Sequence, residues 1–159
     1  KLYPPKERNL EKVKKYWKLL VSIKPVCEIY GENSLNEKNI SIDHFVPWSY
    51  VAHDELWNLT PTTRSINSSK SNSLPDWNTY FPMLCKNEYL SYEMMWEYPE
   101  IHVAFEKCAR EHLNNQEIKH KLYQRGLSER EFSGRLEEVM LPVYQSAKSM
   151  GFSNWSLRV

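Results

Sequence analysis

An adjacent acid and imidazole, Asp43 and His44, end a short apolar run in the stretch ISIDHFVPWS. The neighbouring Ile40, Ile42 and Phe45 favour an apolar setting, whereas a carboxylate and an imidazole are costly to bury without partners. An ordinary imidazole titrates near pH ~6.5, so it can be neutral and accept a proton at physiological pH. The pair therefore predicts either a satisfied hydrogen bond at a strand end or a proton acceptor beside a metal ligand.

Three more polar residues follow the pair in a fixed order. Asn58 lies fourteen residues after the histidine, Asn67 nine residues later, and Lys70 three residues beyond that. The carboxylate of Asp43 and the amide oxygen of Asn67 are hard oxygen ligands that suit Mg²⁺ or Mn²⁺. Lys70 lies one helical turn past Asn67, where an ammonium group could reach a phosphate. Each residue alone has an ordinary explanation as a cap, a turn or a solvated side chain, but coincidence does not readily explain all of them in this order.

The elements that must position these residues form a strand–loop–strand–helix unit over about 39–72. Residues 39–46 are predicted as the first strand, closed by Pro47, and residues 56–60 as the second. A loop separates the two strands, and a short helix is expected over 64–71. Such a unit can point all of the polar residues into one cleft.

Helices are expected on both sides of this unit. Apolar residues three and four apart predict an amphipathic helix over 7–22, followed by turns or a short hairpin over 26–38. After residue 75 the pattern is helical, with Pro99 at a helix start and Ser128 opening a capping box. The predicted fold class is therefore α+β and mostly helical. Its catalytic part, with the N-terminal helix, spans 1–75, and a helical region spans 76–159.

The length of 159 residues suits one domain, or one domain with an appendage, and 13% aromatic residues provide material for a packed core. The net charge is +1, but residues 1–24 hold eight Lys or Arg against two Glu. A basic first helix could follow a phosphate backbone, or it could be an ordinary solvated face.

Three widely spaced cysteines, Cys27, Cys85 and Cys108, are an odd number and do not form a disulfide framework. They predict reduced thiols in a cytoplasmic protein. No apolar run approaches the ~20 residues that span a bilayer, so no membrane partner is expected. The chain begins with Lys1 rather than Met, which leaves open that it is part of a longer protein.

The ordered pattern I-D-H-x-V-P-x-S, D-x-x-x-N-L and N-x-x-K-S, within residues 40–75, resembles the HNH endonucleases. The similarity is to the variant with Asn at the third signature position, as in the HNH domain of Cas9-type proteins. The resemblance implies a ββα-metal fold and one divalent cation, Mg²⁺ or Mn²⁺, held by Asp43 and Asn67. It also implies that His44 is the general base and that Asn58 braces the loop and the orientation of the histidine.

The resemblance further implies a nucleic acid partner, DNA more than RNA, and products with a 5′-phosphate and a 3′-hydroxyl. Lys70 and Arg64 are predicted phosphate contacts, while Trp48 and Tyr50 either stack on bases or pack under the loop. A homodimer or a larger complex would suit double-strand cutting, and a restriction or anti-phage role is a further hypothesis. The alternative is a module that keeps the fold and binds nucleic acid without cutting it.

The chain departs from many HNH proteins at the two Cys-x-x-Cys knuckles that bind a structural zinc. The first would fall at 27–30, where Tyr30 replaces the second cysteine, and the second at 63–66, which has none. Four thiolate ligands cannot be assembled there, so no structural zinc is predicted and Tyr30 and Ile66 are expected to pack in its place. Cys108 and His112, one turn apart, are interpreted as core or surface residues rather than metal ligands.

Overall fold

The computed structural model describes residues 9–51 and 53–157. Its small sheet pairs β1 (Ser41–His44) with β2 (Leu59–Thr62) in antiparallel order. Helix α3 (Arg64–Lys70) follows β2 directly, so a hairpin and a helix form the predicted ββα unit. The prediction of an α+β, mostly helical fold is confirmed.

The second strand lies later in the chain than the predicted 56–60. Residues Leu56–Asn58 form a 3₁₀ turn, η1, and the strand starts only at Leu59. The strand also includes Pro61, which pairs with Ile42. Proline is tolerated here because both strands of a two-stranded sheet are edge strands, where a missing N–H need not break a ladder.

The segments before and after β1, residues 26–38 and 47–55, contain some regular structure. The predicted loop 47–55 contains a short helix, α2 (Trp48–Val51). The segment 26–38, predicted as turns or a hairpin, closes on a single antiparallel bridge between Cys27 and Ser34. Both segments flank β1, so their geometry bears on the polar residues at its end.

The first helix, α1, spans Glu11–Ile23 and ends before Pro25, as predicted. Residues 7 and 8 of the predicted helix lie outside the described residues. One face of α1 is buried because its apolar residues recur at helical spacing. The buried residues are Val13, Tyr16, Trp17 and Leu20.

The region after residue 75 contains four helices in the described residues. Proline 99 is the first residue of its helix, and Ser128 with Glu131 makes the predicted capping box. Pro82 and Pro142 lie inside helices that continue past them. The helices are α4 (Trp77–Glu97), α5 (Pro99–His112), α6 (Gln116–Tyr123) and α7 (Glu129–Ser149).

Two features of this region were not predicted. Only Leu122 and Tyr123 are buried in helix α6. Two adjacent apolar positions do not show the repeated spacing by which an amphipathic helix is recognised in a sequence. A parallel two-residue bridge joins β3 (Leu74–Pro75) to β4 (Asn154–Trp155). Each strand is too short to give a sequence pattern, although the bridge ties the end of the chain to the end of the ββα unit.

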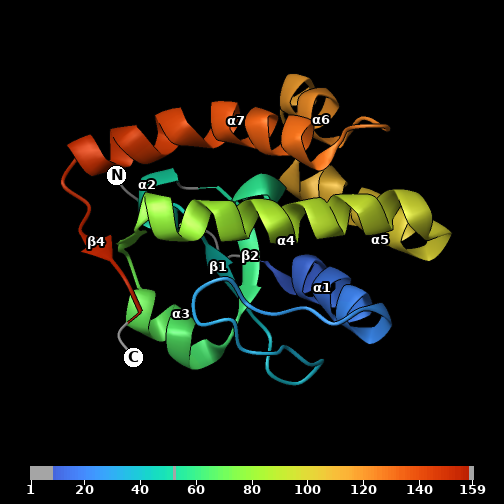
Figure 1. Cartoon of the computed structure of the whole chain (residues 1–159), viewed down its shortest axis with the longest axis horizontal. Helices are drawn as coiled ribbons and strands as arrows, with labels where there is room; N and C mark the ends of the chain where they lie inside the picture. Colours follow the sequence, from blue (N-terminus) through green and yellow to red (C-terminus); the bar gives the residue numbers. More distant parts are fainter. Residues whose placement is uncertain (1–8, 52, 158–159) are drawn as a thin grey trace, which may run out of the picture.

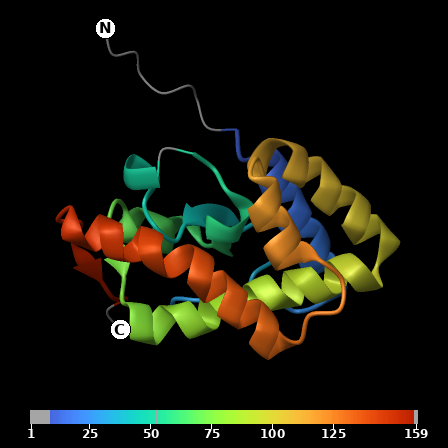
Figure 2. The ribbon, with the colours of Figure 1, turned by 90° about the horizontal axis from the view of Figure 1, so that it is seen from above.

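The ββα unit and the helical region share one hydrophobic core. Phe45, just after β1, has its ring 6.4 Å from that of Trp77, 6.3 Å from Phe81 and 6.5 Å from Tyr144. Helix α4 packs against α5, α7 and β2, and α5 packs against α1 and η1. Figures 1 and 2 show α4 and α7 running side by side, with α1 close to α5. The helical region therefore supports the ββα unit directly.

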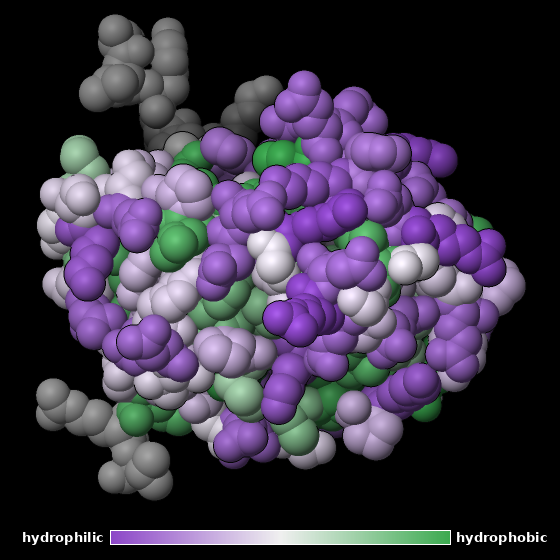
Figure 3. Space-filling view, turned by 45° about the horizontal axis from the view of Figure 1, so that its top comes forward, coloured by the Kyte–Doolittle hydropathy of each residue, from purple (hydrophilic) through white to green (hydrophobic). Residues whose placement is uncertain are grey.

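The surface is mainly polar. Figure 3 shows a face on which hydrophilic residues predominate and apolar residues occur singly or in small groups. Only Val103 and Met150 are large hydrophobic residues with a high exposed fraction among those that the structure describes. Within residues 9–51 and 53–157, no helix combines the length and hydropathy needed to cross a bilayer.

Glu88, on the buried face of α4, makes the stability of this core depend on pH. Burial raises the pKa of its carboxyl well above the usual range, and its Oε1 has no hydrogen-bond partner among the described residues. The folded state therefore holds a proton that the unfolded chain releases near pH ~4.3. The stability that this group contributes is fully present below that pH and is lost as pH rises toward the folded-state pKa.

We expect Glu88→Gln to remove this dependence, because the amide does not titrate. Between pH 5 and 8 the wild-type free energy of unfolding should fall relative to the variant, by up to ~1.4 kcal/mol per pH unit. Urea unfolding at several pH values measures the difference, and Glu93→Gln, at an exposed position on the same helix, is the control. Parallel pH curves for wild type and Glu88→Gln would contradict the prediction.

Candidate active site

A cavity of about 470 Å³ lies where β1, the loop after it and α3 meet. Three of the predicted site residues, Asp43, His44 and Asn67, line this cleft together. The fold thus brings a carboxylate, an imidazole and a carboxamide from two elements to one surface. The other lining residues are Leu10, Ile42, Pro47, Trp48, Ser68, Ser71 and Asn72.

Asp43 is held from two sides. Its side chain is 3% exposed, and Oδ2 accepts a hydrogen bond from the Tyr30 hydroxyl at 2.5 Å. Its Oδ1 accepts one from Lys70 Nζ at 3.2 Å. A buried carboxylate with a cationic partner and a hydroxyl donor is hydrogen-bonded on both oxygens and has a fixed direction.

Lys70 has a different position from the one predicted. Its side chain is fully buried, and Nζ donates to the backbone oxygen of His44 at 2.7 Å as well as to Asp43. A direct contact with a phosphate in solvent does not fit this position, because the ammonium group points inward. The physical reason is the buried Asp43 carboxylate, because a buried charge without a partner of opposite charge strongly destabilises the fold. Lys70 therefore stabilises the end of β1 through Asp43 and the His44 carbonyl, with its ammonium group buried in the protein.

His44 is also nearly buried, with its side chain 7% exposed. Its Nε2 lies 2.5 Å from Oδ1 of Asp54, which comes from the loop between α2 and η1. Asp54 was not among the predicted site residues. The signal that could have found it is the first letter of the D-x-x-x-N-L segment, a carboxylate ten residues after the histidine.

Asn58 braces the backbone that follows His44. Its Oδ1 accepts from the Val46 N–H at 2.8 Å, and its Nδ2 donates to the Val46 carbonyl at 2.9 Å. The Asn58 carbonyl in turn accepts from the Phe45 N–H at 2.8 Å. The side chain is buried, so these bonds lock the turn after β1 to the start of β2.

Asn67 projects from α3 toward β1. Its Nδ2 donates to Ser41 Oγ at 2.9 Å and to the Ile42 carbonyl at 3.2 Å, which directs its Oδ1 away from those groups. Arg64, one turn earlier on α3, is exposed and is not among the residues that line the cleft. Its contact with a phosphate remains a prediction.

A buried carboxylate organises the loop where the first zinc knuckle would lie. Glu28 is fully buried, and its Oε1 accepts from the backbone N–H of Gly31 at 2.6 Å and of Asn33 at 3.0 Å. Its Oε2 accepts from Tyr30 N at 3.3 Å and Thr62 Oγ1 at 3.4 Å, which links the loop to β2. A Cβ at Gly31 would lie 2.8 Å from Asn33 Nδ2 and 2.9 Å from Leu157 Cδ2, so a larger residue there would displace these side-chain ends. The loop is thus held by hydrogen bonds to one carboxylate.

Tyr30 and Ile66 are both buried at the positions expected to replace zinc. The Tyr30 ring packs edge-on against Tyr80 and Trp155, each with ring centroids 5.2 Å away. Tyr30 does more than fill space, since its hydroxyl holds Asp43. Burial, followed by the charge of Asp43, raises the pKa of the Tyr30 phenol well above its ordinary value, so the hydroxyl remains a donor.

We expect Tyr30→Phe to leave the ring packing intact and remove this one hydrogen bond. The change should lower the free energy of unfolding by ~1–3 kcal/mol, because a buried acceptor loses its donor. Chemical denaturation measures the loss. Tyr50→Phe, which removes a hydroxyl bonded to Ser146 in an exposed setting, should cost less and is the matched control. Equal losses for the two variants would contradict a special role for the buried bond.

The donor set at the cleft fits a hard divalent cation. Each Asp43 oxygen accepts one hydrogen bond and has a second lone-pair site, so the carboxylate can still face a cation, as can Oδ1 of Asn67. Among the residues that the structure describes, no three His, Cys, Asp or Glu side chains gather as a metal cage. Mg²⁺ often takes only one or two protein ligands, and completes its shell with water and substrate phosphate.

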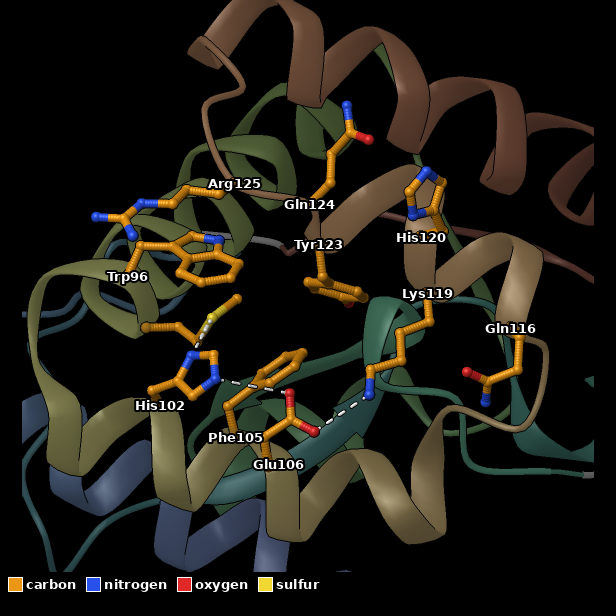
Figure 4. Close-up of a pocket in the computed structure, with 11 residues that line it drawn as sticks. Trp96, His102, Phe105, Glu106, Gln116, Lys119, His120, Tyr123, Gln124 and Arg125 are labelled. Carbon is orange, nitrogen blue, oxygen red and sulfur yellow. Dashed lines mark hydrogen bonds and ion pairs between the residues drawn. The ribbon is translucent and has the colours of Figure 1, made fainter.

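A second cavity, of about 310 Å³, lies among α4, α5 and α6 (Figure 4). Its carboxylate, Glu106, pairs with Lys119 at 3.1 Å and with His102 at 3.8 Å, and Arg125 lies over the ring of Trp96. The charged side chains there are paired with one another rather than directed at a common point. The cleft at β1 is therefore the better candidate for an active site.

Comparison with known proteins agrees with this choice. Residues 28–76 match a family model described as HNH endonuclease, which confirms the resemblance on which the site residues were predicted. The match begins at Glu28 and ends at Asp76, so it includes the Glu28 loop, the hairpin and α3. This part of the chain is similar to an HNH endonuclease domain, which suggests nuclease activity in general. No curated protein and no solved structure matched the chain.

Proposed function

We propose that this protein is a cation-dependent endonuclease that hydrolyses phosphodiester bonds of DNA in the cleft of Asp43, His44 and Asn67. The observation that supports it most is the meeting of these three side chains at one cavity of the region that is similar to an HNH endonuclease domain. Asp43 and Asn67 would hold one Mg²⁺ or Mn²⁺, and no structural zinc is part of the proposal.

His44 is the general base in this proposal. It takes the proton of a water molecule as the water oxygen forms a bond to phosphorus. The bond from phosphorus to the departing 3′-oxygen breaks, which leaves a 5′-phosphate and a 3′-hydroxyl after that oxygen gains a proton from solvent. A divalent cation, when bound, stabilises the charge that develops on the leaving oxygen.

The surrounding residues hold this geometry. Tyr30 and Lys70 fix the direction of the Asp43 carboxylate, and Asn58 fixes the backbone next to His44. The site is therefore arranged before substrate arrives, which is where much catalytic advantage originates.

The substrate is proposed from the charge of α1 and from the family resemblance. Helix α1 starts directly after Leu10, a lining residue of the cleft, and carries exposed lysines that are suited to a phosphate backbone. DNA rather than RNA, a homodimer or larger complex, and a restriction or anti-phage role rest on family resemblance alone. The free thiols of the three cysteines suit a cytoplasmic location.

The experiment is to incubate purified protein and Mg²⁺ with supercoiled plasmid, single-stranded DNA and a structured RNA. We expect DNA to be cut into fragments that a DNA ligase can rejoin, because the ends carry a 5′-phosphate and a 3′-hydroxyl. Cleavage of RNA alone would overturn the DNA assignment. Binding to DNA without cleavage of any substrate would overturn the nuclease proposal and favour the non-cleaving module.

A further inference from the structure

We propose that Asp54 and His112 are positioning residues for His44, so that the helical region after residue 75 completes the active site. The inference rests on the proposed function and deepens it. It starts from two short contacts that connect β1 to α5 through the loop between them.

The first contact orients the imidazole. Oδ1 of Asp54 lies 2.5 Å from Nε2 of His44, and the two side chains are 14% and 7% exposed. An ionised carboxylate can only accept a hydrogen bond, so Nε2 bears the hydrogen in this pair. A neutral ring then has its basic lone pair on Nδ1, which assigns the nitrogen that takes the proton of water.

The carboxylate has a second effect on the same ring. When His44 accepts a proton it becomes a cation, and a carboxylate in hydrogen-bond contact stabilises that cation. The aspartate of a serine protease triad has this role toward its histidine, where loss of the carboxylate changes the tautomer and slows the reaction. Asp54 thus does not touch the reacting atoms and acts through His44.

The second contact holds Asp54 in place. Asp54 lies between α2 and η1, outside any regular element that could fix its backbone. The Asp54 carbonyl lies 2.7 Å from Nδ1 of His112, the last residue of α5. Because a carbonyl only accepts, His112 donates this bond from Nδ1–H.

His112 is well placed to act as a fixed donor. Its side chain is 5% exposed, and its Nε2 is buried with no hydrogen-bond partner among the described residues. Glu111 Oε2 lies 3.7 Å from Nε2, beyond hydrogen-bond distance, so the bond from Nδ1 to the Asp54 carbonyl is the hydrogen bond that orients the ring. Cys108, one turn earlier, donates instead to the Lys12 carbonyl at 3.2 Å, so the two side chains serve different contacts rather than one metal.

Through these contacts the helical region positions the loop that carries Asp54. Helix α5 packs on α1 and η1, which makes it a firm support for the loop between α2 and η1. The chain of contacts runs from His112 to the Asp54 backbone, and from the Asp54 side chain to His44. The HNH endonuclease match ends at residue 76, so His112 lies outside the matched region.

The test compares cleavage by two pairs of variants in the full chain. Asp54→Ala removes the carboxylate, while Asp54→Asn keeps an acceptor oxygen without the charge. His112→Leu removes the donor, while His112→Asn keeps an N–H donor near the position of Nδ1. We expect kcat to fall at least ~10-fold for Asp54→Ala and His112→Leu, with KM little changed, and a partial recovery in each conservative variant.

A second readout needs neither substrate nor cation. The nitrogen shifts of the His44 ring, measured by NMR, should show hydrogen on Nε2 in the neutral wild-type ring and a mixture of tautomers in Asp54→Ala. Wild-type kcat in both Asp54→Ala and His112→Leu, or hydrogen on Nδ1 in the neutral wild-type ring, would overturn the inference. If wild type cuts no nucleic acid, the proposed function fails, and the NMR result alone decides whether Asp54 orients His44.

Discussion

Replacing His44 by alanine should slow DNA cleavage by ~10²- to 10⁴-fold, the usual contribution of a general base. His44 lines the cleft beside Asp43 and is the imidazole in contact with Asp54. Removing the ring takes away the proposed acceptor for the proton of water. Single-turnover cleavage of plasmid at saturating protein measures the loss in the chemical step.

The control for this prediction is His53→Ala. His53 lies next to Asp54 in the same loop, but it is exposed and does not line the cleft. Its removal should change the rate little. Since the His44 side chain is buried, the melting temperature of His44→Ala must also be compared with that of wild type. A folded His44→Ala that cuts as fast as His53→Ala would rule out the assigned base.

Replacing Lys70 by methionine should lower the free energy of unfolding by ~3–5 kcal/mol, because it leaves the buried Asp43 charge without its cation. The Lys70 and Asp43 side chains are 0% and 3% exposed. Methionine fills a similar volume, so the loss comes from the charge and not from a cavity. Denaturant unfolding at neutral pH measures it.

Two further variants separate this effect from ordinary loss of a surface ion pair. Lys12→Met breaks the pair between the Lys12 and Glu111 side chains, which are 47% and 39% exposed, and should cost much less because solvent screens an exposed pair. Combining Lys70→Met with Asp43→Asn removes both buried charges and should recover part of the loss. A cost for Lys70→Met as small as that for Lys12→Met would show that the pair is not a support of the site.

The ββα unit and its cleft residues could be predicted because their signals are local. Apolar residues flank Asp43 and His44, and α3 begins after a proline and two threonines, with Thr63 as its cap. The 3₁₀ turn before β2 was missed, since an apolar run of a few residues does not distinguish a turn from a strand. The second strand was therefore predicted a few residues too early, although Asn58 still lies directly before the observed strand.

Contacts between distant residues could not be predicted in the same way. Lysine alone in a sequence indicates a solvated side chain, and the buried Asp43 that draws Lys70 inward is 27 residues away. The burial of Glu28 could not be predicted either, because nothing in the sequence distinguishes it from an exposed acidic residue. His112 was interpreted as a core or surface residue; the structure buries it, and its contact with Asp54 depends on how α5 packs on η1.

In the proposed mechanism the protein cleaves DNA with His44 as base and a cation held at Asp43 and Asn67. The measurement that tests it most directly is plasmid cleavage by purified wild type and His44→Ala in Mg²⁺, in EDTA, and after excess Mg²⁺ is restored. We expect wild type to cut only when Mg²⁺ is present and to recover when Mg²⁺ is restored after EDTA, and we expect little cutting by His44→Ala throughout. Cutting that persists in EDTA, or that His44→Ala performs equally well, would contradict the proposed mechanism.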